Sequence, residues 1–269
     1  MHKTILITGA TDGIGLETAR LLASLGHRVL LHGRNPAKLA AVEKELSKHT
    51  GVQVACFAAD LSVLGEVDTL AQAVIDDHTS LDVLINNAGV FATQDTMTSD
   101  GLDVRFAVNT VAPYLLTKRL LPLLGTSGRV VNLSSAAQST VDLDALVGEV
   151  RLSDGQAYAQ SKLALTSWSR SLALSLAGEG PTIVAVNPGS MLGTKMVREA
   201  YGVHGADVRV GAEILRRAAL SEEFGRASGE YFDNDSGRFA APHPDALDPL
   251  TSETIVRSIE AILARHDLS

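Results

Sequence analysis

The sequence predicts a single-domain α/β protein with a doubly wound parallel sheet, a fold of Rossmann type. Short β-branched runs alternate with longer stretches in which apolar residues recur at helical spacing. The predicted strands are largely continuous apolar runs, which indicates that helices bury both faces of the sheet. The 269 residues are 45% hydrophobic and contain no repeat, low-complexity tract or linker. We therefore expect one domain over residues 1–269.

The elements are predicted in chain order from their apolar spacing and end signals. Glycine at position 26 ends the first helix, and Asn35-Pro36 supplies a cap and a first-turn proline for the second. Strands are expected at residues 5–8, 29–31, 52–57, 81–85, 129–133 and 182–186, and helices at 13–25, 35–49, 62–77, 100–124 and 155–177. After residue 188 the pattern loosens, and we expect a last strand at 228–233, a Pro-rich surface segment at 240–244 and a last helix at 252–265.

Composition and charge exclude several classes of protein. Lys and Arg number 23 against 31 Asp and Glu, and there is no basic cluster, so we expect no nucleic-acid partner. The single cysteine, Cys56, excludes a disulfide framework and a multi-cysteine metal site, and no metal is expected. No apolar run reaches the roughly 20 residues of a membrane helix, and the first residues lack the layout of a signal peptide. We expect a cytoplasmic protein.

A glycine-rich turn follows the first strand. Its spacing, G-x-x-x-G-x-G, lets the backbone turn tightly, and helix N–H groups then favour a pyrophosphate. Cofactor contacts are expected from Gly9, Thr11, Asp12, Gly13, Ile14 and Gly15. A tight turn without a ligand is the alternative, and the carboxylate of Asp12 counts mildly against a nearby phosphate.

The end of the second strand indicates which dinucleotide is preferred. An acid there would accept a hydrogen bond from the 2′-hydroxyl of NAD, but this strand ends in His32-Gly33-Arg34-Asn35. Arg34, with Asn35 beside it, is available for a 2′-phosphate. We therefore expect NADP(H) to be preferred over NAD(H), with a solvated surface arginine as the alternative for Arg34.

A tyrosine and a lysine share one helix face at positions 158 and 162. An ammonium beside a phenol lowers the phenol pKa, which makes Tyr158 a candidate general acid or base. A tyrosine next to a solvent-facing lysine is the alternative. Polar residues also follow two buried strands, where open α/β sheets place ligands: Ser134-Ser135 and Asn86-Asn87. Asn109 is expected in the middle of an apolar helix, where it needs hydrogen-bond partners.

Together these motifs resemble the short-chain dehydrogenase/reductase family. The match comprises the glycine turn, Asp60 with Leu61, Asn87-Ala88-Gly89, the tetrad Asn109, Ser135, Tyr158 and Lys162, and Pro188-Gly189 after the sixth strand. The segments around Arg34 and Tyr231 are similar to the branch of retinol dehydrogenases and protochlorophyllide reductases. One departure concerns Thr194. The family usually has a threonine four residues after the glycine of the Pro-Gly pair, whereas Thr194 lies five residues after Gly189.

The resemblance implies an NAD(P)-dependent oxidoreductase that interconverts a carbonyl and an alcohol. Tyr158 would donate the proton, Lys162 would lower its pKa and hold the cofactor ribose, and Ser135 would donate to the developing charge. Asn109 would hold a water for a proton relay. The segment 189–229 would cover a partly apolar substrate through Met191, Leu192, Met196, Val197 and Tyr201, although these are equally ordinary packing residues.

The resemblance also implies a homodimer or homotetramer that pairs helices 100–124 and 155–177 between subunits. The alternative functions are a non-catalytic NADP(H)-sensing protein on the same scaffold and a sugar-nucleotide epimerase. The epimerases usually carry a different glycine spacing, G-x-x-G-x-x-G. A sensor has no need of a proton donor such as Tyr158.

Overall fold

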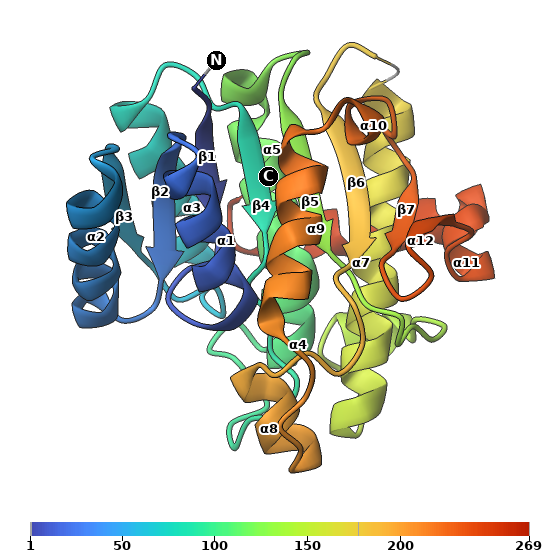
Figure 1. Ribbon diagram of the computed structural model, residues 1–269. Coiled ribbons are helices and arrows are strands. Elements are labelled where there is room, and N and C mark those ends of the chain that lie inside the picture. The colour runs from blue at the N-terminus through green and yellow to red at the C-terminus, as the bar shows by residue number, and fades with distance from the viewer. Residues whose placement is uncertain (1, 177, 269) are drawn as a thin grey trace.

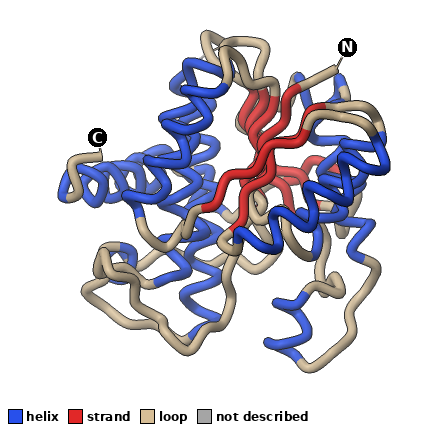
Figure 2. Tube along the Cα trace, turned by 90° about the vertical axis from the view of Figure 1, so that its left-hand side faces the viewer, coloured by secondary structure: helices blue, strands red, loops and turns tan. Residues whose placement is uncertain are grey.

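The computed structural model describes residues 2–176 and 178–268 and shows a twisted central sheet between two layers of helices (Figures 1 and 2). In this part of the chain the sheet has eight strands in the order β3-β2-β1-β4-β5-β6-β7-β8. They are β1 (Thr4–Ile7), β2 (Arg28–Gly33), β3 (Val54–Ala58), β4 (Val83–Asn86), β5 (Arg129–Leu133), β6 (Thr182–Asn187), β7 (Tyr231–Asp233) and β8 (Arg238–Ala240). Neighbouring strands are parallel except for β7 and β8. This confirms the predicted fold class.

The two faces of the sheet are covered by different helices. One face packs on α1 (Gly13–Ser24), α2 (Pro36–Thr50) and α9 (Val208–Leu220). The other packs on α3 (Leu64–Asp77), α5 (Ala112–Leu124), α7 (Asp154–Leu176) and α12 (Pro249–Arg265). Strands β1 to β6 therefore contribute residues to both apolar cores, which explains the continuous apolar runs of the sequence.

Helix ends follow the capping residues. Asn35 caps α2 by accepting from the Lys38 N–H at 3.1 Å, and Pro36 begins the helix. Asp248 caps α12 by accepting from the Thr251 N–H at 2.9 Å, so this helix begins three residues earlier than predicted. The predicted end of the α7 helix at residue 177 lies outside the described residues.

The predicted single helix at 100–124 is wrong in its start and its continuity. Asp103 caps a short helix, α4 (Val104–Phe106), which continues into a π-helical turn, η1 (Ala107–Val111), and then into α5. A π turn inserts an extra residue into a helix, and no apolar period reveals it. Asn109 lies within this turn.

The segment after β6 is more regular than the sequence indicated. It forms α8 (Lys195–Tyr201), α9 and α10 (Glu222–Gly225). The strand expected at 228–233 is shorter and corresponds to β7, which begins at Tyr231. The predicted surface segment at 240–244 is partly or fully exposed and links β8, which ends at residue 240, to α11 (Pro244–Leu247). A further short helix, α6 (Leu143–Leu146), precedes α7. Within the described ranges no helix is long and apolar enough to span a bilayer.

Candidate active site

The predicted site residues gather at the carboxyl ends of the parallel strands. The strand order reverses between β1 and β4, and such a switch point is where open α/β sheets bind ligands. The glycine turn follows β1, Asn87-Ala88-Gly89 follows β4, Ser135 follows β5 and Pro188-Gly189 follows β6. The structure thus brings the predicted motifs to one edge of the sheet.

The glycine turn is held tightly against the turn after β4. The Asn87 Nδ2 atom donates to the carbonyl oxygens of Thr8 (2.8 Å) and Gly9 (3.2 Å). Gly9 has a positive φ of 66°, and a Cβ on Gly15 would lie 2.2 Å from the Gly9 carbonyl oxygen. Both positions therefore require glycine. α1 begins at Gly13, directly after this turn, and a helix N-terminus at a strand end favours an anionic diphosphate.

Asp12 caps α1 and accepts from the Gly13 N–H at 2.7 Å. The carboxylate therefore serves the helix end itself, next to the predicted phosphate position. Thr11 packs on the other side of the turn, since a Cβ on Gly33 would lie 2.8 Å from the Thr11 Cγ2 atom. Ile14 contacts α9, where a Cβ on Gly211 would lie 3.1 Å from its Cδ1 atom.

The adenosine side is formed by the ends of β2 and β3. Arg34 and Asn35 are exposed at the start of α2. Asp60 follows β3, and its Oδ1 atom accepts from the N–H (2.9 Å) and hydroxyl (2.7 Å) of Ser62, while Leu61 is buried. Arg34 is therefore an accessible cation. The neighbouring loop after β3 is ordered by the hydrogen bonds between Asp60 and Ser62.

The predicted proton donor and its lysine lie together on α7. The Lys162 Nζ atom is 5.7 Å from the centre of the Tyr158 ring and donates to the Leu133 carbonyl oxygen at 2.6 Å. Lys162 is only 4% exposed, so it is not a solvent-facing lysine. Tyr158 is half-buried, and its ring packs on Phe91 with centroids 5.0 Å apart.

Burial lowers the pKa of Lys162 to about 7. Desolvation disfavours the ammonium relative to the neutral amine. A nearby anion, such as a phenolate at Tyr158, favours the charged form and restores it. The lysine charge and the tyrosine charge are therefore coupled.

Asn109 anchors the loop after β4. It exchanges two hydrogen bonds with the backbone of Val90, at 2.8 and 2.9 Å, and donates to the Ser161 hydroxyl at 2.9 Å. The nearby Gly89 connects the motifs, because a Cβ placed there would lie 3.4 Å from Asn109 Oδ1 and 3.7 Å from Lys162 Nζ. The buried Asn109 therefore finds the hydrogen-bond partners that were expected from the sequence. They lie in the loop after β4 and on α7.

Ser135 is held from β7 as well as from its own loop. Its carbonyl oxygen accepts from the Tyr231 hydroxyl at 3.1 Å and from Gln138 Nε2 at 2.9 Å, while its Oγ atom accepts from the Ala137 N–H. The Ser135 side chain is partly exposed at the strand end. A donor at this place is consistent with the role predicted for it.

The segment after β6 folds back over the site. Asn234 donates to the Pro188 carbonyl oxygen at 2.9 Å, and Gly189 has a positive φ of 117°. Thr194 caps α8 and packs on the glycine turn, since a Cβ on Gly13 would lie 3.5 Å from its Cγ2 atom. Met196 reaches Gly89, where a Cβ would lie 3.7 Å from the Met196 Cε atom. The side chain of Tyr201 lies outside what the structure describes.

Three neighbours of the site were not assigned a role from the sequence. Phe91 stands two residues after Gly89, Tyr231 lies in β7, and His32 lies near the end of β2. An aromatic residue two positions after the motif of β4 was the available signal for Phe91. The contacts of Tyr231 and His32 join residues that lie far apart in the sequence, so no local pattern reveals them.

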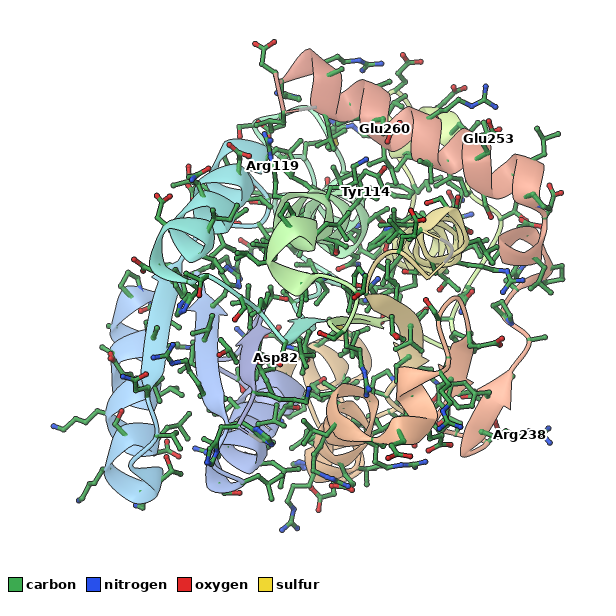
Figure 3. All side chains as sticks on the ribbon, turned by 90° about the horizontal axis from the view of Figure 1, so that it is seen from above. Asp82, Tyr114, Arg119, Arg238, Glu253 and Glu260 are labelled. Carbon is green, nitrogen blue, oxygen red and sulfur yellow. The ribbon has the colours of Figure 1, made fainter. Side chains whose placement is uncertain are left out.

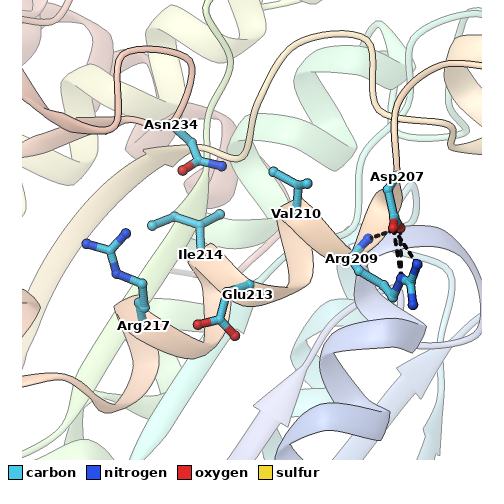
Figure 4. Close-up of a pocket in the computed structure, with 7 residues that line it drawn as sticks. All are labelled: Asp207, Arg209, Val210, Glu213, Ile214, Arg217 and Asn234. Carbon is cyan, nitrogen blue, oxygen red and sulfur yellow. Dashed lines mark hydrogen bonds and ion pairs between the residues drawn. The ribbon is translucent and has the colours of Figure 1, made fainter.

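A separate surface pocket lies on the exposed side of α9 (Figure 4). Its ionic lining is already paired, as in the contact of Arg209 with Asp207. It contains none of the predicted site residues. Among the described residues, no group of three or more His, Cys, Asp or Glu could hold a metal ion.

Comparison with known proteins identifies relatives of the whole fold. A family profile for short chain dehydrogenase matches residues 3–202. Human retinol dehydrogenase 13 is 33% identical, with an alignment that covers 98% of this chain and 84% of the relative.

Solved structures are similar over nearly the same range. An uncharacterised protein from Mycobacterium paratuberculosis has a TM-score of 0.79 and 29% identity, covering 97% of this chain and 92% of its own. The RhlG/NADP active-site complex of Pseudomonas aeruginosa has a TM-score of 0.71 and 26% identity, covering 87% of this chain and 95% of its own.

Proposed function

This chain belongs to the short-chain dehydrogenase family, and we propose that it interconverts a carbonyl and an alcohol with NADP(H). It is an NAD(P)-dependent oxidoreductase of small molecules. The observation that carries the proposal is the placement of Lys162, buried at the end of β5 and 5.7 Å from the Tyr158 ring. A sensor without catalysis could use the lysine to hold the cofactor ribose, but it would have no need of Tyr158 as a proton donor beside that lysine.

The proposed chemistry assigns one role to each side chain. When bound, the reduced nicotinamide supplies a hydride to the carbonyl carbon. The Tyr158 hydroxyl then gives its proton to the carbonyl oxygen, and the Ser135 hydroxyl donates a hydrogen bond to the same oxygen as charge develops.

Lys162 and Asn109 support the proton transfer. The Lys162 ammonium favours the phenolate that Tyr158 becomes, and it holds the nicotinamide ribose. Asn109 fixes the loop that carries Gly89 and holds the water of the proton relay. The N–H groups at the start of α1 receive the diphosphate.

The preference for NADP(H) is the finer part of the proposal. No acid stands at the end of β2, and the exposed Arg34 is free to meet a 2′-phosphate, while Asn35 and Asp60 border the adenosine. The RhlG complex, a relative of similar fold, contains NADP. NAD(H) is the alternative cofactor.

The substrate is proposed to be partly apolar. Phe91 packs on the proton donor, and Met196 reaches Gly89 beside Lys162, so apolar groups border the place where the carbonyl would lie. The segment 189–229, which carries Met196, would cover it. The similarity to retinol dehydrogenase 13 agrees with a substrate of this kind.

The assembly and the location are also proposals. The family resemblance implies a homodimer or homotetramer, but α12 of the same chain lies on α7 and reaches α5. Figure 3 shows Glu260 of α12 beside Tyr114 of α5, and the Tyr114 hydroxyl donates to Glu260 at 2.7 Å. We propose that these helices do not pair between subunits. A cytoplasmic location stays a prediction.

A panel of aldehydes and ketones tests the proposed function. NADPH and NADH are each supplied, and loss of nicotinamide absorbance is followed. We expect turnover of apolar carbonyl compounds with NADPH. Tight NADPH binding without turnover of any carbonyl or alcohol would favour the sensing alternative.

A further inference from the structure

His32 lies one residue before the end of β2 and is 2% exposed, yet the proposed chemistry leaves it unused. Its ring contacts two other loops of the cofactor site. The Gly9 N–H donates to Nδ1 at 3.3 Å, and Nε2 lies 3.0 Å from the Ala59 carbonyl oxygen. The His32 carbonyl oxygen also accepts from the Ala10 N–H at 2.9 Å.

The two partners determine the state of the ring. A carbonyl oxygen only accepts, so Nε2 carries the hydrogen, and an amide N–H only donates, so Nδ1 presents its lone pair. The imidazole is therefore neutral. Burial lowers the pKa of His32 to about 4; the charged groups that face it are Asp60, which raises the pKa, and Arg34, which lowers it.

We propose that His32 is a positioning residue that fixes the spacing between the diphosphate turn and the adenosine pocket. Its ring joins Gly9, in the loop after β1, to Ala59, which directly precedes Asp60. Arg34 lies two residues after His32, directly after the end of the same strand. The proposal deepens the proposed function and rests on it, because it concerns the binding of the same dinucleotide.

The geometry at Gly9 gives this link a local effect. The peptide groups on either side of Gly9 are held from two directions, with its N–H on His32 and its carbonyl oxygen on Asn87. Without the imidazole, one restraint is lost at a residue whose φ is 66°. The pairing of β1 with β2, including Ile7 with Leu31, does not depend on the ring.

Three substitutions separate the two hydrogen bonds. His32→Leu removes both. In His32→Asn the amide oxygen occupies the place of Nδ1 and keeps the acceptor for Gly9, whereas in His32→Gln the amide nitrogen occupies the place of Nε2 and keeps the donor to Ala59.

The experiment measures NADPH binding by fluorescence, hydrogen exchange of the Gly9 amide, melting temperature, and kcat and KM for a turned-over carbonyl. In His32→Leu we expect the NADPH dissociation constant to rise about tenfold and the Gly9 amide to exchange faster. The kcat at saturating NADPH and the KM for the carbonyl should stay near wild type. His32→Asn should restore most of the affinity, and His32→Gln should not.

Several outcomes would overturn the inference. One is wild-type NADPH affinity in His32→Leu, with or without a lower melting temperature. If His32→Leu does not fold, equal affinities in the Asn and Gln variants would do the same. A wild-type protein that binds neither NADPH nor NADH would refute the proposed function itself, whereas wild-type binding with an unaffected His32→Leu refutes only the role of His32.

Discussion

The Nζ atom of Lys162 lies 5.7 Å from the centre of the Tyr158 ring, one helical turn away on α7. The same atom donates to the carbonyl oxygen of Leu133, the last residue of β5. Helix α7 and strand β5 therefore position the Lys162 amine beside the Tyr158 phenol. The charge of Lys162 depends on the charges next to it, that of Tyr158 included. The pH dependence of catalysis should report this coupling.

Lys162→Met tests the two roles proposed for the lysine. A cation favours the phenolate, so removing it raises the pKa of Tyr158, and residual activity should move to higher pH. One pKa unit corresponds to about 1.4 kcal/mol, so a modest interaction gives a visible shift. Cofactor affinity should also fall. Unchanged affinity and an unchanged pH–rate profile would remove Lys162 from the mechanism.

Arg34→Ala tests the cofactor preference. A charge-assisted hydrogen bond to phosphate contributes roughly 1.5–3 kcal/mol, so NADP(H) affinity should fall about tenfold or more while NAD(H) affinity stays constant. Arg257→Ala, at an exposed arginine on α12, is the matched control and should change neither. Equal affinity of the wild-type protein for NADP and NAD would contradict the preference.

His32 should also affect stability in acid. Its folded-state pKa of about 4 lies below the ordinary value of 6.5, so between these values the unfolded chain binds more protons. The free energy of unfolding should then decrease by roughly 1–2 kcal/mol from pH 6.5 to pH 5 through this residue. Urea titrations of wild type and His32→Gln measure the difference. Parallel pH dependences in the two proteins would exclude a buried neutral imidazole.

The position of α12 predicts that α7 stays outside any subunit interface. Because α12 lies on α7 and reaches α5, we expect the mass measured by light scattering not to depend on the exposed side chains of α7. Leu174 is 59% exposed on α7, so Leu174→Glu should leave the mass unchanged. An oligomer that Leu174→Glu dissociates would place α7 in a subunit interface after all.

The sequence was sufficient for the parallel sheet and for the edge that carries the motifs. Strand length and apolar content determine burial, and the carboxyl ends of parallel strands meet at one edge, so Gly9, Asn87 and Ser135 had to lie near one another. The same local signals could not reveal η1 or α8. A π turn changes no residue pattern, and α8 is a short helix of seven residues.

The contacts that tune the site depend on tertiary structure. His32 meets Gly9 across 23 positions, and Tyr231 meets Ser135 across 96. A histidine in a buried strand is equally compatible with simple packing until its two partners are known. The lowered pKa of Lys162 likewise follows from burial, which the four-residue spacing to Tyr158 does not determine.

The most direct test of the account is Tyr158→Phe, measured for NADPH binding and for turnover of the same carbonyl. Only the hydroxyl is removed, and the ring keeps its contact with Phe91, so the variant should fold and bind NADPH nearly as the wild type does. Its kcat should fall by a factor of about 100 or more, because the proton donor is missing. Turnover near the wild-type rate would contradict the assignment of Tyr158 as the acid and, with it, the proposed mechanism.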